Sequence, residues 1–274
     1  PNTVMVLLLT HPGSVNNIVV RPQDLDSVPT LSHAVELKVQ SAGLNFRDVL
    51  NILDLDPTRT VRPLGLECAS VAGVVPKRVT HMRGGASIFG MAAGCLSSIV
   101  RTDARVQVRM PNALSFDEAC TLPILWSTIR LAFAECVQLS KRQGILIHAT
   151  SGGIGLVAVE LAQRVSAFVS SSVGRPSKCA HVSMLGAASV ASSRDAASFV
   201  CGALACLSSR RLHAVLSALT RGFIPTSVAL VNDAGAYLEV GKNNVWSEAR
   251  MGAAACAAPF RLVAADYRSA EWTM

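Results

Sequence analysis

The stretch that decides the fold begins Ile145-Leu-Ile-His-Ala-Thr-Ser-Gly-Gly-Ile-Gly155 and continues Leu156-Val-Ala-Val-Glu-Leu-Ala-Gln-Arg164. Residues 145–149 form a short, mainly apolar run typical of a buried strand, and apolar residues then recur at helical spacing from Ile154 to Val165. The glycines in between allow unusual backbone dihedrals and leave no Cβ between the chain and a ligand. The first amides of the helix would face an anion such as a pyrophosphate. The stretch therefore predicts a strand, a phosphate-binding turn and a helix.

This turn departs from the full glycine fingerprint of dinucleotide-binding folds. Thr150 stands where G-x-G-x-x-G has its first glycine, which leaves A-x-x-G-x-x-G ending at Gly155. Taken alone, the pattern also fits a strand-to-helix turn that binds nothing. As cofactor contacts in the turn we predict Ala149, Thr150, Gly152, Gly153, Ile154 and Gly155.

The composition is that of a globular, core-rich chain. With 274 residues, 50% of them hydrophobic and 16% charged, the chain is long enough for about two domains. No uninterrupted apolar run reaches the ~18 residues of a membrane helix, so we expect no membrane partner. The net charge of +7 is spread over scattered basic residues, and aromatics are 5%, so nucleic-acid binding is not expected. The eight cysteines include no C-x-x-C pair, which favours reduced thiols and no zinc or other metal site.

Two different patterns of apolar and turn-forming residues indicate two domains. Up to about residue 111, short alternating runs broken by Pro and Gly predict an antiparallel β domain. From the capping box Ser115-Phe-Asp-Glu118 onward, helices alternate with short apolar strands, which predicts a doubly wound parallel sheet. We therefore predict an α/β fold with a β domain at 1–112 and a Rossmann domain at 113–274. The strands expected in the second domain are 145–149, 167–171, 189–191, 213–217, 236–240 and 261–265.

The segment after the second Rossmann strand bears on the choice of cofactor. An NAD site places an acidic residue about 20 residues beyond the glycine turn to hold the ribose 2′-hydroxyl. Here the segment contains serines and basic residues but no acidic residue. Such residues can bind a 2′-phosphate, so the segment favours NADP(H) over NAD(H) as the cofactor. A solvated basic loop is the alternative. The predicted phosphate contacts are Ser171, Ser172, Arg175 and Lys178.

Several stretches together resemble the enoyl reductase domains of modular polyketide synthases and animal-type fatty acid synthases, in the medium-chain dehydrogenase/reductase superfamily. Besides the glycine turn, they are spread over nearly the whole chain in the family's order. They are Ala42-Gly-Leu-Asn-Phe-Arg-Asp-Val-Leu50, Leu64-Gly-Leu-Glu-Cys-Ala69, Val79-Thr-His-Met-Arg83, Phe89-Gly-Met91, Arg109-Met-Pro111, Leu114-Ser-Phe-Asp-Glu-Ala-Cys-Thr-Leu-Pro123, Ala191-Ser-Ser-Arg194 and Glu239-Val-Gly-Lys242.

The resemblance implies a GroES-like N-terminal substrate domain, a Rossmann NADP-binding domain and zinc-free chemistry. It implies that NADPH reduces the double bond of an enoyl thioester carried by an acyl carrier protein, within a cytoplasmic megasynthase of several domains. By the same resemblance, Lys242 and Asp266 are the proton-delivery pair; a lysine on a surface loop is the alternative reading. It also places Asn45, Arg47, Arg194 and Gly241 at the cofactor, although Asn45 and Arg47 also fit a turn and an exposed surface.

The chain departs from the family pattern at several positions. Gly85-Ala-Ser-Ile88 replaces Gly-Asp-Arg-Val, and Ser217-Ala-Leu219 replaces Asn-Ser-Leu. Asp56 stands where the family has Tyr or Val, a position that the resemblance places in the substrate cleft. The chain starts without Met, as a segment of a larger protein would, and stops at Met274 before the segment that returns to the first domain in the family. Two alternatives therefore stay open: a degenerate domain with little turnover, and a free-standing quinone oxidoreductase-like enzyme.

Overall fold

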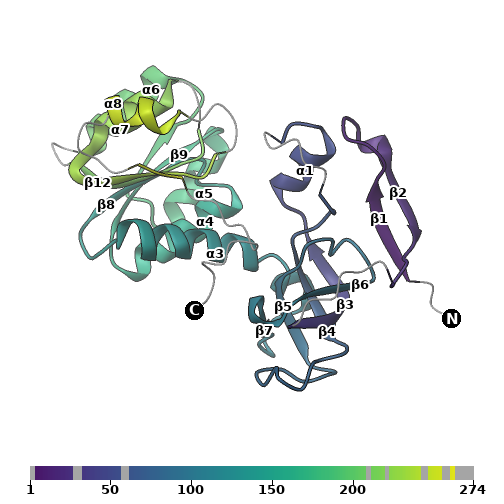
Figure 1. Ribbon diagram of the computed structural model, residues 1–274. Helices are drawn as coiled ribbons and strands as arrows, with labels where there is room; N and C mark the ends of the chain where they lie inside the picture. The colour runs from purple at the N-terminus through teal and green to yellow at the C-terminus, as the bar shows by residue number, and fades with distance from the viewer. Residues whose placement is uncertain are drawn as a thin grey trace. The chain divides into compact units, whose positions relative to one another are not determined.

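The chain divides into two compact units between Ile124 and Leu125 (Figure 1). The computed structural model describes residues 4–26, 33–56, 62–207, 211–219, 222–241, 246–254 and 260–262. The division lies beyond the boundary at 112–113 that the sequence suggested. Two contacts explain the difference: Ala119 packs against Ala69 of the first unit, and the Ile124 amide donates a hydrogen bond to the Glu67 carboxylate.

The first unit contains a five-stranded antiparallel sheet in the order β6-β3-β4-β5-β7 and a separate β1-β2 hairpin. The predicted antiparallel β domain is therefore confirmed. Its sheet core contains Val35, Leu37, Ile88 and Val100, all buried. The elements are β1 (Met5–Leu9), β2 (Ile18–Pro22), β3 (Ala34–Gly43), α1 (Phe46–Ile52), β4 (Glu67–Ala72), β5 (Ser87–Met91), β6 (Ile99–Asp103), β7 (Gln107–Arg109) and α2 (Phe116–Ala119), with 3₁₀ turns at Val15–Asn17 and Ala104–Val106.

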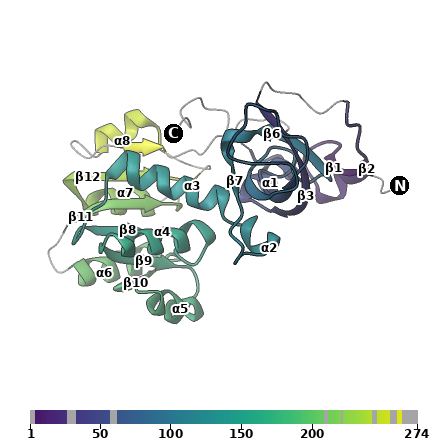
Figure 2. The same cartoon turned by 90° about the horizontal axis from the view of Figure 1, so that it is seen from below.

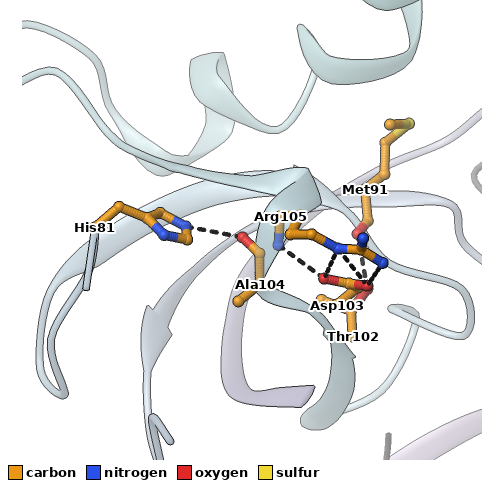
Figure 3. A network of polar contacts seen from close by, with 6 residues as sticks. All are labelled: His81, Met91, Thr102, Asp103, Ala104 and Arg105. Atoms are coloured by element: carbon orange, nitrogen blue, oxygen red, sulfur yellow. Dashed lines mark hydrogen bonds and ion pairs between the residues drawn. The ribbon is translucent and has the colours of Figure 1, made fainter. Parts of the chain in front are cut away.

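Strand β6 has a weak sequence signal, because its buried face carries Val100 and the polar Thr102 and so lacks a clear apolar alternation. The Thr102 hydroxyl instead donates to the Met91 carbonyl at 3.1 Å, which satisfies it inside the sheet. Figure 3 shows this contact beside the turn that follows β6. There Arg105 pairs with Asp103 at 2.7 Å, and a His81 ring nitrogen lies 2.9 Å from the Ala104 carbonyl oxygen.

The second unit is a six-stranded, entirely parallel sheet in the order β10-β9-β8-β11-β12-β13. This is the 3-2-1-4-5-6 order of a Rossmann fold. The strands all run parallel, and the order in which they are added to the sheet reverses between β8 and β11. The predicted doubly wound sheet is confirmed. The elements are α3 (Pro123–Leu131), a π-helical turn (Ala132–Val137), β8 (Gly144–Ile147), α4 (Gly153–Arg164), β9 (Phe168–Val173), a 3₁₀ turn (Pro176–Lys178), α5 (Cys179–Met184), β10 (Ser189–Ser192), α6 (Ala196–Leu207), β11 (Leu212–Ser217), α7 (Phe223–Leu230), β12 (Val231–Glu239), α8 (Glu248–Ala254) and β13 (Phe260–Leu262).

Helices cover both faces of this sheet (Figures 1 and 2). One face packs Ile145 and Ile147 of β8 against α3, α4 and α5. The other packs Leu146 of the same strand against α6, α7 and α8. Burial on both faces explains why β8 reads as a continuous apolar run rather than an alternating one.

One helical stretch, Phe116–Val137, is long and apolar enough by length and composition to cross a membrane, with a mean hydropathy of 1.3 and 28% of its best window buried. Core helices of soluble proteins meet the same test. Asp117, Glu118 and Arg130 interrupt the stretch, so a search for uninterrupted apolar runs passes over it. Ile129 and Phe133 of this stretch pack in the core of the second unit.

Candidate cofactor site

The turn between β8 and α4 is held by hydrogen bonds of its own and of the neighbouring strand. The Thr150 hydroxyl donates to the Ile147 carbonyl at 2.6 Å, and its amide donates to the Ser172 carbonyl on β9 at 3.1 Å. The Gly152 amide donates to the Ala149 carbonyl at 2.9 Å. Ala149 itself has a φ of +50°, a left-handed conformation that costs a non-glycine residue of order 1–3 kcal/mol.

The three glycines of the turn have different surroundings. A Cβ on Gly155 would lie 2.5 Å from the Thr150 Cα and carbonyl oxygen, so only glycine lets the helix approach the turn this closely. A Cβ on Gly153 would lie 2.8 Å from the flexible end of the Leu125 side chain. A Cβ on Gly152 would have a nearest neighbour at 3.3 Å, the Ala149 carbonyl oxygen. Gly155 thus serves packing, whereas Gly152 is exposed at the start of the helix.

The amino end of α4 is able to receive an anion. Gly152 is its N-cap and provides no side-chain hydrogen bond to the first turn. The amides of Gly153, Ile154 and Gly155 have no carbonyl acceptor inside the helix, as in the first turn of any α-helix. Together with the helix dipole, these amides would suit a phosphate group.

Three basic residues follow the neighbouring strands β9 and β10. Arg175 and Lys178 are exposed in the segment after β9. Arg194 follows β10, and its Nε donates to the Gly174 carbonyl at 3.1 Å, which ties it to the same segment. The acid next to it, Asp195, caps α6 by accepting from the Ser198 amide at 2.7 Å. Hydrogen bonds from the Ser198 side chain and amide lower the pKa of Asp195. Two members of the basic trio, Arg175, Lys178 and Arg194, thus lie in a segment that contains no acid, and the third is hydrogen-bonded to it.

The serines predicted to contact a 2′-phosphate lie elsewhere than expected. The side chains of Ser171 and Ser172 are buried within the sheet, and the Ser172 hydroxyl is 2.8 Å from Nδ1 of His148. Strand β9 runs to Val173, two residues beyond the predicted end, so these serines belong to the strand rather than to the loop. The burial of both hydroxyls argues against the predicted phosphate contact.

In the first unit, Asn45 belongs to a network of buried carboxylates. Its side-chain amide donates to Glu67 at 2.8 Å. Its backbone N–H donates to the Asp48 carboxylate at 3.0 Å, a hydrogen bond that caps α1. The Asp48 carboxylate also accepts from the Gly65 amide at 2.9 Å. Burial raises the pKa of Glu67, against hydrogen bonds from the Ile124 amide and Asn45. Arg47 is half-buried and has no acid within 4 Å among the described residues.

Sequence reasoning gave no role to Glu67, although it lies in one of the motifs that carry the resemblance. Its neighbours explain its importance: Asn45 and Ile124 are bonded to it from 22 and 57 residues away. A side chain that joins distant segments leaves no local spacing signal.

The carboxyl ends of β11 and β12 form a second buried polar cluster. Glu239, 1% exposed, accepts from the Gly241 amide at 2.6 Å, and it pairs in register with Ser217 on β11. Burial raises the pKa of Tyr237 beside them. Gly241 is thereby fixed at the end of its strand.

The predicted proton-delivery pair, Lys242 and Asp266, lies outside the described residues. Asp56 is described: it is half-buried and follows α1. Within the described ranges, no group of three or more His, Cys, Asp or Glu residues is placed to hold a metal ion.

Comparisons with known proteins show that the chain is similar in sequence to polyketide synthases. No family model matches it. It is 29% identical over 242 residues to the highly reducing polyketide synthase ZEA2 of Gibberella zeae, covering 87% of this chain and 10% of that protein. The chain spans about a tenth of the length of the curated relatives it matches first.

Among solved structures, the CurK enoyl reductase superposes with a TM-score of 0.89 at 27% identity, over 96% of this chain and 81% of that one. The mycobacterial protein Rv1454c complexed with NADPH has the same fold, with a TM-score of 0.81 at 18% identity over 96% and 81% of the two chains.

Proposed function

We propose that this chain, a homologue of polyketide synthases with the fold of solved enoyl reductases, uses NADPH to reduce the α,β double bond of an enoyl thioester. It is an oxidoreductase of the medium-chain dehydrogenase/reductase superfamily. Its substrate is presented by an acyl carrier protein, and its further partners are the other domains of a cytoplasmic polyketide synthase.

The observation that carries the proposal is the pairing of two anion-binding features on neighbouring strands. The amides at the start of α4 suit the pyrophosphate of a dinucleotide. The basic trio after β9 and β10 suits a 2′-phosphate, and Arg194 is held in place by the Gly174 carbonyl. A nicotinamide cofactor therefore fits the residues present, and the missing acid favours NADPH over NADH.

In this reaction NADPH supplies the hydride that adds to the β-carbon of the enoyl thioester. The chain's own residues hold the cofactor and handle the proton. Gly153, Ile154 and Gly155 would donate their amides to the pyrophosphate. In the first unit, the orientation of the Asn45 amide is fixed by its hydrogen bond to Glu67. Negative charge that develops on the thioester oxygen needs a hydrogen-bond donor, and the α-carbon needs a proton. We assign proton delivery to Lys242 with Asp266, by the family resemblance.

The alternatives are weaker. A free-standing quinone oxidoreductase is not favoured, because the sequence relatives are polyketide synthases. A degenerate domain would keep the fold and lose turnover, and Asp56 is the departure that bears most on it. A negatively charged side chain at this position would oppose the negative charge that develops on the thioester oxygen.

The test is to measure cofactor binding and turnover separately on the purified protein. Fluorescence titration should give an NADPH affinity about tenfold to a hundredfold higher than that for NADH, the value of one charge-assisted contact. Consumption of NADPH should then depend on a crotonyl thioester. Equal affinities for the two cofactors would refute the NADPH assignment, and NADPH binding without turnover would identify a degenerate domain.

A further inference from the structure

His148 is a fully interior histidine that connects three elements of the second unit. It follows β8 and directly precedes the phosphate-binding turn. Its Nδ1 lies 2.8 Å from the Ser172 hydroxyl on β9, and its Nε2 lies 2.8 Å from the Ser227 hydroxyl on α7. Its backbone amide donates to the Leu216 carbonyl on β11 at 3.0 Å. The side chain is 3% exposed.

The surroundings keep this imidazole neutral. The rings of Phe199 and Phe223 pack on it with centroids at 5.2 and 6.4 Å. A neutral ring donates from one nitrogen and accepts at the other, so one serine hydroxyl donates to it while the other accepts from it, whichever tautomer is present. Both ring nitrogens are then satisfied, as a buried polar side chain requires.

Ser172 contacts the turn twice, once on each side of Ala149. Its hydroxyl bonds the His148 ring, and its carbonyl accepts from the Thr150 amide at 3.1 Å. Ala149, between these two attachment points, has the left-handed φ of +50°. Strained residues persist where surrounding contacts fix the backbone on both sides. Two residues beyond Ser172, the Gly174 carbonyl holds Arg194.

We propose that His148 is a positioning residue for cofactor selection: through Ser172 it sets the phosphate-binding turn at a fixed separation from the basic trio. The inference rests on the proposed function, because it assigns pyrophosphate to the turn and the 2′-phosphate to the trio. A ligand with both phosphates must meet both features at once, whereas NADH needs the turn alone. The His148–Ser172 bond therefore contributes to the preference for NADPH.

Two serines on the same ring provide a matched pair of variants. Ser172→Ala and Ser227→Ala each remove one hydroxyl from His148, and each hydroxyl is buried with a 2.8 Å bond. Only Ser172 lies on the strand that leads to the basic trio. His148→Gln keeps one donor and one acceptor and serves as the conservative rescue, whereas His148→Leu removes both.

The measurements are dissociation constants for NADPH, NADH and adenosine 2′-monophosphate, with thermal melting as a control for folding. Ser172→Ala and His148→Leu should weaken NADPH about tenfold, as for a misplaced charge-assisted contact, and leave NADH within twofold. Adenosine 2′-monophosphate touches the basic trio alone and should bind as in the wild type. Ser227→Ala should lower the melting temperature about as much as Ser172→Ala does, but it should keep the wild-type ratio of NADPH to NADH affinity. His148→Gln should restore most of the NADPH preference that His148→Leu loses.

The inference is overturned if the wild type prefers NADPH and Ser172→Ala keeps that ratio, or if Ser227→Ala changes the ratio as much. Loss of adenosine 2′-monophosphate binding in Ser172→Ala would also overturn it, because the loop itself would then be disrupted. If His148→Leu does not fold, Ser172→Ala alone decides. A wild type without preference for NADPH refutes the proposed function instead, and with it the inference.

Discussion

The contrast between Gly155 and Gly152 gives the sharpest test of the turn. Gly155→Ala would bring a methyl group to 2.5 Å from the Thr150 backbone, so the helix or the turn must move by about 1 Å to reach an ordinary contact distance of 3.5 Å. Overpacking of this kind costs about 1–3 kcal/mol. Gly152→Ala meets its nearest neighbour at 3.3 Å with a φ of −91°, which alanine adopts without strain.

We expect Gly155→Ala to lower the melting temperature by roughly 2–4 °C for each kcal/mol lost and to weaken NADPH binding, since the amides of α4 move with the helix. Gly152→Ala should melt within about 0.5 kcal/mol of the wild type and yet bind NADPH less tightly, because the methyl group lies at the proposed phosphate site. Thermal unfolding and fluorescence titration of the two variants measure both effects. A Gly155→Ala variant with wild-type melting and affinity would refute the packing argument.

Four further outcomes follow from other positions. Burial lowers the pKa of His148 from 6.5 to about 3, so the unfolded chain binds a proton below pH 6.5 that the folded state does not bind. The unfolding free energy should therefore fall by about 2 kcal/mol from pH 7 to pH 5. Denaturant titration should show a smaller fall in the His148→Gln variant. Ala149→Gly should raise the unfolding free energy by up to about 1 kcal/mol and Ala149→Val lower it, since valine tolerates a positive φ poorly; equal stabilities would contradict the strain. Lys242→Ala should reduce crotonyl thioester turnover roughly 10²–10⁴-fold with NADPH affinity unchanged, and unaltered turnover would make it a surface residue. Asp56→Tyr should raise the turnover rate of the crotonyl thioester. If the wild type already turns over at an ordinary enzymatic rate and Asp56→Tyr leaves that rate unchanged, Asp56 does not impair the reaction.

The sequence predicted the strand, the glycine turn and the helix that follows because the information for these elements is local. Gly152, Gly153 and Gly155 adjoin an apolar strand and an apolar helical stripe, and both patterns have short periods. The role of His148 had no such signal, because its partners lie 24 and 79 residues away. A histidine after a strand indicates neither its burial nor its hydrogen bonds.

Errors in the fold prediction have similar causes. Strand β9 was ended too early, since Ser171 and Ser172 read as a polar loop although the sheet buries them. The domain boundary was placed before the capping box at Ser115, which does form as predicted. Helix α2 nevertheless packs on the first unit through Ala119. A cap marks where a helix starts, not which core it joins.

The order of strands in the parallel sheet has a consequence for synthesis of the chain. Central strand β8 pairs with β9, which follows closely, and with β11, where the linked residues Gly144 and His213 are 69 positions apart. Closing a loop of that length costs roughly 4 kcal/mol in chain entropy. As the chain leaves the ribosome, β8, β9 and β10 emerge first, and the backbone N–H and C=O groups along one edge of β8 stay unpaired until β11 follows. This edge lies at the centre of the finished sheet, so its exposure is confined to the growing or unfolded chain, where unpaired strand edges favour aggregation.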